Sequence, residues 1–258
     1  MKLTILGSGT CVPSVKRASP GLFLEENKLK ILIDCGPGAL RQIVKAGKDY
    51  KDIDLVLLNH LHTDHVSDLF ALIQALSWTP DLGSKDNYFH RKEDLYIYAA
   101  KGFKKWFNSI QKINKVYPRF NTFNIKVSEF KFEQKFKNIK IETIKGNHNI
   151  YSRPMKIFYR NKNFVYSGDT DYDPKLIKLA QNTDLLILEC SWPDKYKCSG
   201  HLTPDECGQI AAAANAKKLL LIHLYPPMDS YINTIKFSIR KHYKGPVILA
   251  KDLMQIKI

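Results

Sequence analysis

The stretch Asn59-His60-Leu61-His62-Thr63-Asp64-His65 decides the fold, and it follows the apolar run Leu55–Leu58. The apolar run predicts a short strand, and apolar side chains recur at helical spacing after His65, so the histidines lie where a strand gives way to a helix. His60 and His62 are two residues apart and leave an extended segment on the same side. Asp64 and His65 follow as the chain turns. Imidazole nitrogen and carboxylate oxygen suit a borderline ion such as zinc, so we predict a metal site here.

Strands and helices are predicted to alternate along the rest of the chain. Apolar runs bounded by Gly, Pro, Asn or Asp are typical of strands, and they lie at 2–6, 21–25, 29–34, 55–59, 95–99, 123–127, 139–144, 156–159, 164–167, 185–189 and 219–223. Helices are expected over 38–46, 65–78 and 204–216. The last of these has Thr203 as N-cap, Pro204 in its first turn and Glu206 completing a capping box. This mixture favours two sheets sandwiched by helices in one domain, but composition alone does not distinguish that arrangement from other α/β layouts.

The motif H-x-H-x-D-H after an apolar strand resembles the metallo-β-lactamase superfamily of metal-dependent hydrolases. The resemblance implies an α/β fold, the αββα sandwich of two mixed β-sheets flanked by helices, in a single domain over residues 1–258. It also implies three later ligands, and His148, Asp169 and His223 each follow a predicted strand. A histidine such as His223 is, alone, more often an ordinary polar residue. Carried over position by position, the resemblance implies two ions, one bound by His60, His62 and His148, the other by Asp64, His65 and His223, with Asp169 as a bridge.

The same resemblance indicates the metal and its chemistry. Iron-binding redox members of the superfamily usually carry a glutamate where this chain has His62, which favours two Zn²⁺ ions and hydrolysis; Mn²⁺ or Fe²⁺ also accept these ligands. Two ions about 3.5–4 Å apart share a water, lower its pKa toward ~7 and stabilise the oxygens of an in-line displacement. Asp64 is then expected to serve both as a ligand and as the base that takes a proton from the water.

Further motifs resemble one branch of the superfamily, the ribonuclease Z-like enzymes, which trim the 3′ end of transfer RNA precursors. They are Gly7–Pro13 with Arg17, Asp34–Ala39 followed by Arg41-Gln42, Glu189 ahead of Ser191, Gly200–Thr203 and a closing strand at Ala250–Met254. By this resemblance His201 is the general acid, Glu189 supports it and Asp34 braces the ligand loop. A plainer alternative for His201 is a residue that only precedes the Thr203 cap. His90 and His242 match no motif and are expected on the surface.

The sequence departs from the ribonuclease Z-like pattern at two places that bear on the choice of substrate. The transfer-RNA-clasping arm is inserted between the third-histidine and bridging-aspartate motifs, but only 20 residues separate His148 from Asp169. The chain also reads Leu188-Glu189 where the branch has His-Glu. We therefore expect a phosphodiesterase or endoribonuclease acting on RNA or a nucleotide, with hydrolysis of a small cyclic nucleotide, aryl phosphate or aryl sulfate ester as the alternative. A non-enzymatic nucleic-acid-binding module is the third interpretation.

The composition sets the remaining expectations. The 258 residues are 44% apolar and carry a formal charge of +15, which indicates a folded, basic protein. The segment Lys101–Phe120 contains basic and aromatic residues and no acid, so it either binds nucleic acid or packs its aromatic stripe into the core. No apolar stretch approaches the ~20 residues that a membrane-spanning helix needs. A cytoplasmic location, five reduced cysteines and, by the resemblance, a homodimer are expected.

Overall fold

The computed structural model describes residues 1–115 and 123–258, whose strands form two mixed seven-stranded sheets. The first sheet has the order β14-β1-β2-β3-β4-β5-β6 and the second β13-β12-β11-β10-β9-β8-β7. The strands of the first sheet are β1 Lys2–Gly7, β2 Gly21–Glu26, β3 Leu29–Ile33, β4 Leu55–Leu58, β5 Leu95–Ala99, β6 Ile125–Glu129 and β14 Gln255–Lys257. Those of the second are β7 Glu133–Phe136, β8 Ile139–Thr143, β9 Met155–Tyr159, β10 Lys162–Tyr166, β11 Leu185–Glu189, β12 Leu219–Ile222 and β13 Val247–Leu249.

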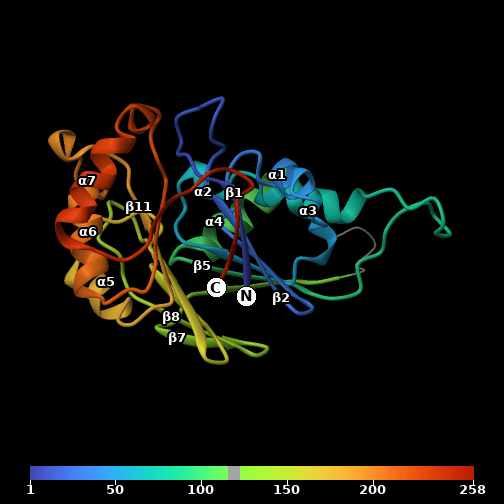
Figure 1. The fold of residues 1–258 in the computed structure, drawn as a ribbon. Helices are drawn as coiled ribbons and strands as arrows, with labels where there is room; N and C mark the ends of the chain where they lie inside the picture. Colours follow the sequence, from blue (N-terminus) through green and yellow to red (C-terminus); the bar gives the residue numbers. More distant parts are fainter. Residues whose placement is uncertain (116–122) are drawn as a thin grey trace.

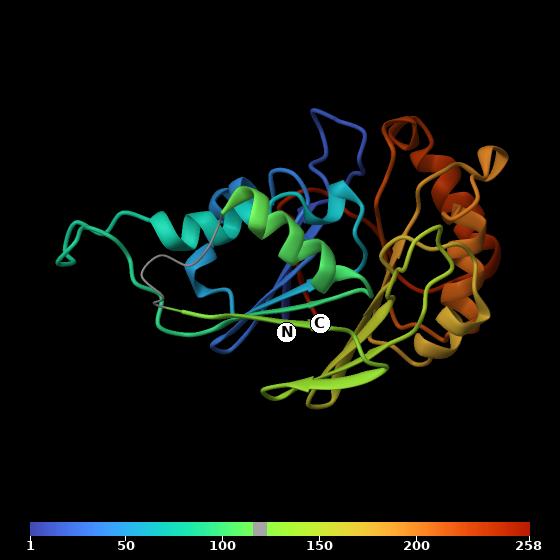
Figure 2. The ribbon, with the colours of Figure 1, turned by 180° about the vertical axis from the view of Figure 1, so that it is seen from behind.

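Helices cover the outer face of each sheet (Figure 1). The first sheet carries α1 Ala39–Lys45, α2 Thr63–Val66, α3 Leu69–Trp78 and α4 Phe103–Asn114, and the second carries α5 Pro174–Leu179, α6 Pro204–Ala213 and α7 Ile232–His242. Short 3₁₀ turns lie at η1 Tyr50–Asp52, η3 Asp194–Tyr196 and η4 Pro226–Ser230. Seen from behind, the two sheets lie between the two groups of helices (Figure 2). The predicted αββα sandwich is therefore confirmed.

Strand alternation explains the layers. In β4, Leu55 and Leu57 pack into the core between the sheets, whereas Val56 and Leu58 pack against α1 and α3. The strand is buried on both faces, so an unbroken apolar run rather than an alternating one encodes it. In β12, Leu220 and Ile222 face the same inter-sheet core, and their neighbours face α5, α6 and α7.

Parallel pairing places the predicted site at one edge of the sandwich. β10, β11 and β12 run parallel to one another, and β4 runs parallel to β3 and β5. The carboxyl ends of neighbouring parallel strands meet at the same sheet edge, where ligand sites of open α/β sheets lie. His60, Asp169 and His223 each follow such a carboxyl end, so strands from both sheets contribute to one site.

Two predicted elements are wrong in detail. The helix expected over 65–78 is two helices, because the Cys35 amide donates to the His65 carbonyl (2.7 Å) and the Asp68 amide donates to the Cys35 carbonyl (3.0 Å). The closing strand expected at Ala250–Met254 is a turn between β13 and β14. There the Asp252 carboxylate accepts hydrogen bonds from the loop after β1, among them those of the Ser8 amide and hydroxyl.

Other expectations for local structure agree with the model. Thr203 and Glu206 form the predicted capping box of α6. In α4, Phe103 and Phe107 are buried while the neighbouring lysines are exposed, so the aromatic stripe packs inward. Residues 116–120 of the predicted basic segment lie outside the described residues. All five cysteines are free. None of the helices that the described residues form has the length and apolarity to cross a bilayer.

Candidate metal centre

The first group of predicted ligands converges around His62. Nδ1 of His62 lies 3.0 Å from Nε2 of His60 and 3.4 Å from Nε2 of His148. His60 Nε2 is also 3.7 Å from Oδ2 of Asp169. His60 and His62 follow β4, while His148 lies in the loop between β8 and β9. Three imidazole nitrogens and one carboxylate oxygen therefore face a common point.

The second group converges on the other oxygen of Asp169. Oδ1 of Asp169 lies 3.3 Å from Nε2 of His65 and 3.3 Å from Nε2 of His223. Each of these nitrogens is also 3.5 Å from Oδ2 of Asp64. Asp64 and His65 are presented by α2, and His223 follows β12. Because each oxygen of Asp169 faces a different group, its carboxylate spans the two.

The donor atoms fit bound metal ions better than a hydrogen-bonded cluster. His65 Nε2, His223 Nε2 and Asp169 Oδ1 are buried and have no hydrogen-bond partner among the described residues, a costly arrangement unless another group satisfies them. Four ligand atoms about 2.0–2.1 Å from a tetrahedral zinc ion lie roughly 3.3–3.4 Å from one another. The 3.3–3.5 Å separations in the second group match that geometry.

A buried carboxylate orients His65. Nδ1–H of His65 donates to Oδ2 of Asp34 (2.8 Å), which leaves the Nε2 lone pair for a metal. The same oxygen accepts a hydrogen bond from the Tyr166 hydroxyl (2.7 Å), and the other accepts one from the Asn59 amide (2.8 Å). Asp34 thus braces the ligand loop, as the resemblance implied. Tyr166 and Asn59 were not predicted, because no local motif marks the partners of a side chain that is distant in sequence.

Glu189 and Ser191 brace the opposite side of the centre. The buried Glu189 carboxylate accepts from the Ser191 hydroxyl (2.5 Å) and lies 3.0 Å from Nδ1 of His201. Ser191 Oγ lies 3.0 Å from Nδ1 of His223. Oxygen or nitrogen atoms of Asp169, His201 and His223 lie within 4.8 Å of one another. His201 therefore lies beside the second group, with Glu189 behind it.

Burial and neighbouring charges shift the pKa values of the ligand side chains. Burial and the neighbouring imidazole of His65 lower the pKa of His60 well below its usual value, so His60 is in the neutral form that binds metal. For His65, burial opposes protonation, but the carboxylates of Asp169 and Asp34 outweigh it and raise the pKa. For Asp169, burial is likewise outweighed by His223 and His65, so its pKa lies well below the usual range. The carboxylates of Asp34 and Asp169 thus attract positive charge to this point.

All nine predicted site residues lie in this one region, whereas the two unassigned histidines do not. His90 pairs with Asp86 (2.8 Å) and His242 with Asp205 (3.1 Å), both on partly exposed surface.

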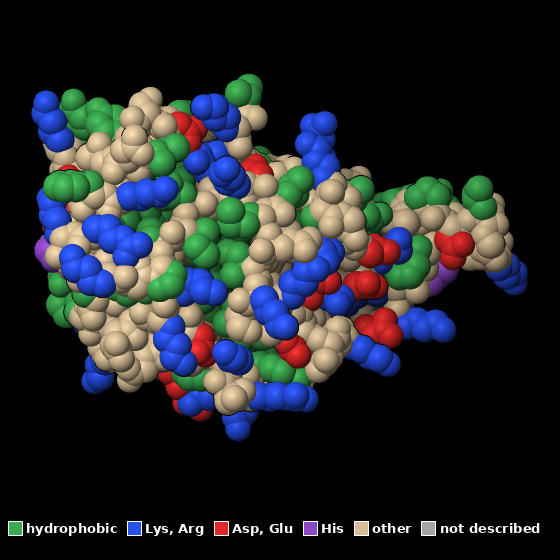
Figure 3. Space-filling view, viewed as in Figure 1, with side chains coloured by type: hydrophobic (Ala, Val, Ile, Leu, Met, Phe, Trp, Pro, Cys, Tyr) green, Lys and Arg blue, Asp and Glu red, His purple; other side chains and the backbone are tan. Residues whose placement is uncertain are grey.

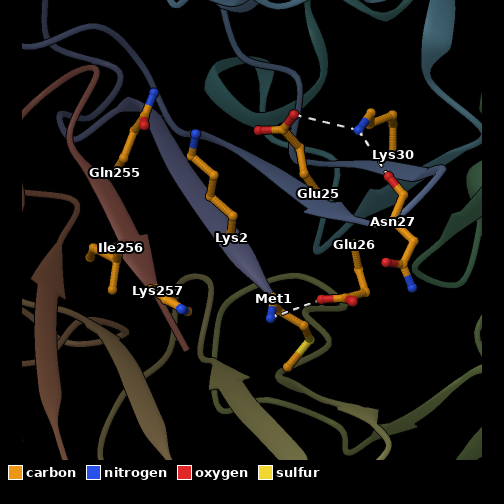
Figure 4. A pocket seen from close by; sticks show the side chains of 9 residues that line it. All are labelled: Met1, Lys2, Glu25, Glu26, Asn27, Lys30, Gln255, Ile256 and Lys257. Carbon is orange, nitrogen blue, oxygen red and sulfur yellow. Dashed lines mark hydrogen bonds and ion pairs between the residues drawn. The ribbon is translucent and has the colours of Figure 1, made fainter.

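A cavity of about 570 Å³ lies at the other end of the first sheet, beside the amino end of β1. It is lined by residues such as Met1, Lys2 and Glu26 (Figure 4). None of the predicted site residues lines it.

Comparisons with known proteins show the family to which the chain belongs. The model of the family described as "Anti-Pycsar protein Apyc1" matches residues 1–240. The chain belongs to this family. Ribonuclease Z of Archaeoglobus fulgidus is 26% identical in an alignment that covers 100% of this chain and 97% of the relative.

Solved structures agree on the fold. The metallo-β-lactamase fold protein YhfI from Bacillus subtilis superposes with a TM-score of 0.83 at 25% identity, covering 99% of this chain and 98% of that one. Human tRNase Z, short form, superposes with a TM-score of 0.78 at 22% identity, covering 100% and 99%. The family member described here is thus a metal-dependent hydrolase of the metallo-β-lactamase fold, similar to ribonuclease Z.

Proposed function

We propose that the protein is a dinuclear zinc phosphodiesterase that hydrolyses a phosphodiester bond of a nucleotide. The observation that carries the proposal is the meeting of two ligand groups at the Asp169 carboxylate, with the His201–Glu189 pair beside them. The first group is His60, His62 and His148, and the second is Asp64, His65 and His223. Two zinc ions held there would supply a water of lowered pKa and positive charge facing the phosphate oxygens.

Asp64 is the residue proposed to accept the proton of the attacking water. Its side chain is 8% exposed, against 3% for Asp169, so of the two ligand carboxylates it is the more accessible. Only one of its oxygens, Oδ2, faces the imidazoles of His65 and His223. The other oxygen is available to hold a proton within hydrogen-bond reach of a water at the centre.

His201 is proposed to give a proton to the leaving oxygen. Its Nδ1 faces Glu189, at 3.0 and 3.1 Å from the two carboxylate oxygens, which leaves Nε2 as the donor to substrate. Burial opposes protonation of His201, but Glu189 outweighs it and raises the pKa. A raised pKa favours the protonated imidazole, which suits a leaving alkoxide because that group departs poorly without a proton.

A short connection and an aromatic pair beside the centre favour a small nucleotide. The 20 residues between His148 and Asp169 are taken up by the rest of one loop and the β9–β10 hairpin, so this described segment carries no clasping arm. The partly exposed rings of Trp192 and Tyr225 stack at 4.8 Å. The Tyr225 ring lies 6.2 Å from that of His201. An aromatic pair at this place can support a nucleobase by stacking.

Maturation of transfer RNA is the second candidate, because relatives along the whole chain are named Ribonuclease Z. α4 adds exposed lysines, Lys104, Lys105 and Lys112, which suit a phosphate backbone. On the face shown in Figure 3, however, lysines and arginines are scattered among apolar and acidic side chains rather than gathered into one tract. A small nucleotide therefore remains the first candidate.

A substrate panel with zinc-loaded protein tests the proposal. It comprises bis(p-nitrophenyl) phosphate, p-nitrophenyl phosphate, p-nitrophenyl sulfate, the four 3′,5′-cyclic ribonucleotides and a transfer RNA precursor. We expect turnover of the diesters, loss of turnover in His148→Ala, and retention in the matched surface variant His242→Ala. Cleavage of the precursor but of no cyclic nucleotide would favour the second candidate. Turnover of the sulfate alone would exclude phosphodiester hydrolysis.

A further inference from the structure

The ammonium group of Lys197, next to the candidate metal centre, contacts three segments of the chain. Nζ of Lys197 lies 2.6 Å from Oδ1 of Asp171 and 2.5 Å from the His201 carbonyl oxygen. It also donates to both carboxylate oxygens of Glu206, at 2.8 and 2.7 Å. Asp171 follows β10, His201 precedes α6, and Glu206 belongs to the first turn of α6. Lys197 itself lies directly after η3 and has a side chain only one-third exposed.

Asp171 continues this connection to the ligand loop that carries His148. Its second oxygen, Oδ2, accepts a hydrogen bond from the Gly200 amide (2.8 Å). Its own amide donates to the Asn147 carbonyl (2.7 Å). The Gly200 carbonyl in turn accepts from Nδ1–H of His148 (2.9 Å). Lys197 and Asp171 therefore hold the backbone on both sides of the Gly200–His201 peptide.

Besides the contacts of Lys197 and Asp171, two hydrogen bonds hold the backbone of this loop: the Gly200 carbonyl accepts from His148 (2.9 Å), and the His201 amide donates to the Cys198 carbonyl (3.3 Å). Cys198 and Ser199 are exposed, and Gly200 has a φ of 87°, a conformation that glycine adopts without strain. The His201 ring is tethered by Glu189, but the position of Nε2 also depends on where the backbone of His201 lies. A displacement of about 1 Å at a reacting group can cost on the order of 100-fold in rate.

We propose that Lys197, acting with Asp171, is a positioning residue that holds loop 197–201 so that His201 can reach the leaving oxygen. The inference rests on the proposed function, because it assumes that His201 protonates a leaving group. The p-nitrophenolate ion departs without a proton, whereas the ribose alkoxide of a cyclic nucleotide needs one. Loss of Lys197 should therefore slow the hydrolysis of a cyclic nucleotide and leave the hydrolysis of a p-nitrophenyl ester unchanged.

The test compares Lys197→Met with wild type on bis(p-nitrophenyl) phosphate and on the 3′,5′-cyclic ribonucleotide that wild type hydrolyses fastest. We expect kcat for the cyclic nucleotide to fall by roughly 10- to 100-fold, with kcat for the aryl ester and the zinc content close to wild type. Lys197→Arg should recover part of the loss. Lys195→Met, an exposed lysine of η3, is the matched control and should behave as wild type.

Several outcomes would overturn the inference. Equal loss on both substrates, or loss of zinc from Lys197→Met, would assign Lys197 to the stability of the centre rather than to the position of His201. If circular dichroism shows that Lys197→Met is unfolded, Asp171→Asn carries the test, with the same expected split between substrates. Failure of wild type to hydrolyse any diester would refute the proposed function itself, which is a different result from an equal loss in the variant.

Discussion

Asp169 is the residue on which both ligand groups depend. Its Oδ2 faces His60 and its Oδ1 faces His65 and His223, and Oδ1 is buried with no hydrogen-bond partner among the described residues. His148, by contrast, approaches only the first group, through His62. The two residues should therefore differ in how much metal their loss releases.

We expect Asp169→Ala to lose both zinc ions and His148→Ala to retain about one. The reason is that the aspartate would supply an oxygen to each ion, whereas the histidine would supply a nitrogen to one. Metal content per chain, measured by inductively coupled plasma mass spectrometry after dialysis, checks the prediction. Equal metal content in the two variants would show that Asp169 does not bridge.

The variant Asp64→Asn distinguishes metal binding by Asp64 from its proposed role as proton acceptor. The amide keeps one oxygen for a metal but cannot accept the proton of the attacking water, so we expect kcat to fall by about 10²- to 10⁴-fold with most of the zinc retained. Turnover of bis(p-nitrophenyl) phosphate and metal content are measured on the same sample. Full turnover with two zinc ions bound would mean that Asp64 is a ligand only.

Short spacing predicts the candidate ligands between His60 and His65, whereas His148, Asp169 and His223 are predicted by the resemblance to the superfamily. His60, His62, Asp64 and His65 fall within six positions, and the later ligands follow predicted strands. The residues that orient them could not be found in this way. Tyr166 reaches Asp34 across 132 positions, and Gly200 contributes a backbone carbonyl to His148, a role that leaves no side-chain signature.

At the scale of elements, strands with a local apolar signal were predicted well and polar or short ones were not. β7, at the edge of its sheet, reads Glu133–Phe136 and is mostly polar, so no apolar run marks it. α2 and α3 were merged because their break depends on hydrogen bonds from Cys35, which comes from another loop. The capping box of α6 was predicted because it is complete within four residues.

Thr203→Ala tests the contribution of that box. Thr203 Oγ1 accepts from the Glu206 amide, and the Glu206 carboxylate accepts from the Thr203 amide. Loss of the hydroxyl should lower the free energy of unfolding by about 1 kcal/mol. Urea denaturation of Thr203→Ala and of the conservative Thr203→Ser checks this. Identical stability of the alanine variant and wild type would show that the cap is not needed.

The ion pairs of Glu25 on β2 predict how the stability of the protein depends on pH. Its carboxylate lies 2.5 Å from Nζ of Lys48 and 3.5 Å from Nζ of Lys30. Burial opposes ionisation of Glu25, but the two ammonium groups outweigh it and lower the pKa. A lowered pKa in the folded state adds stability above the pKa of the unfolded chain, and this contribution disappears as the pH falls through the folded-state value.

We therefore expect Lys48→Met to destabilise the protein more at pH 7 than at pH values below the lowered pKa of Glu25. The measurement is the free energy of unfolding from urea titrations at neutral and acidic pH. Lys45→Met, an exposed lysine of α1, is the control and should show little difference between the two conditions. A destabilisation by Lys48→Met that is the same at both pH values would contradict the assignment.

At the scale of the whole molecule, the centre exists only where the two sheets meet. The first sheet and its helices supply the cluster from His60 to His65, and the second supplies His148, Asp169 and His223. The inter-sheet core, with residues such as Leu57 and Ile222, fixes one half against the other. The αββα architecture was predictable because most strands carry an apolar pattern and because the histidine motif resembles that of the metallo-β-lactamase superfamily. The single-domain boundary, the cytoplasmic location and the homodimer stay predictions.

Anomalous diffraction at the zinc edge from crystals grown with zinc tests the central claim most directly. The account predicts two peaks per chain, one among His60, His62 and His148, the other among Asp64, His65 and His223, with Asp169 between them. A single peak, or peaks at other places in a structure where these side chains do not lie close together, would contradict it.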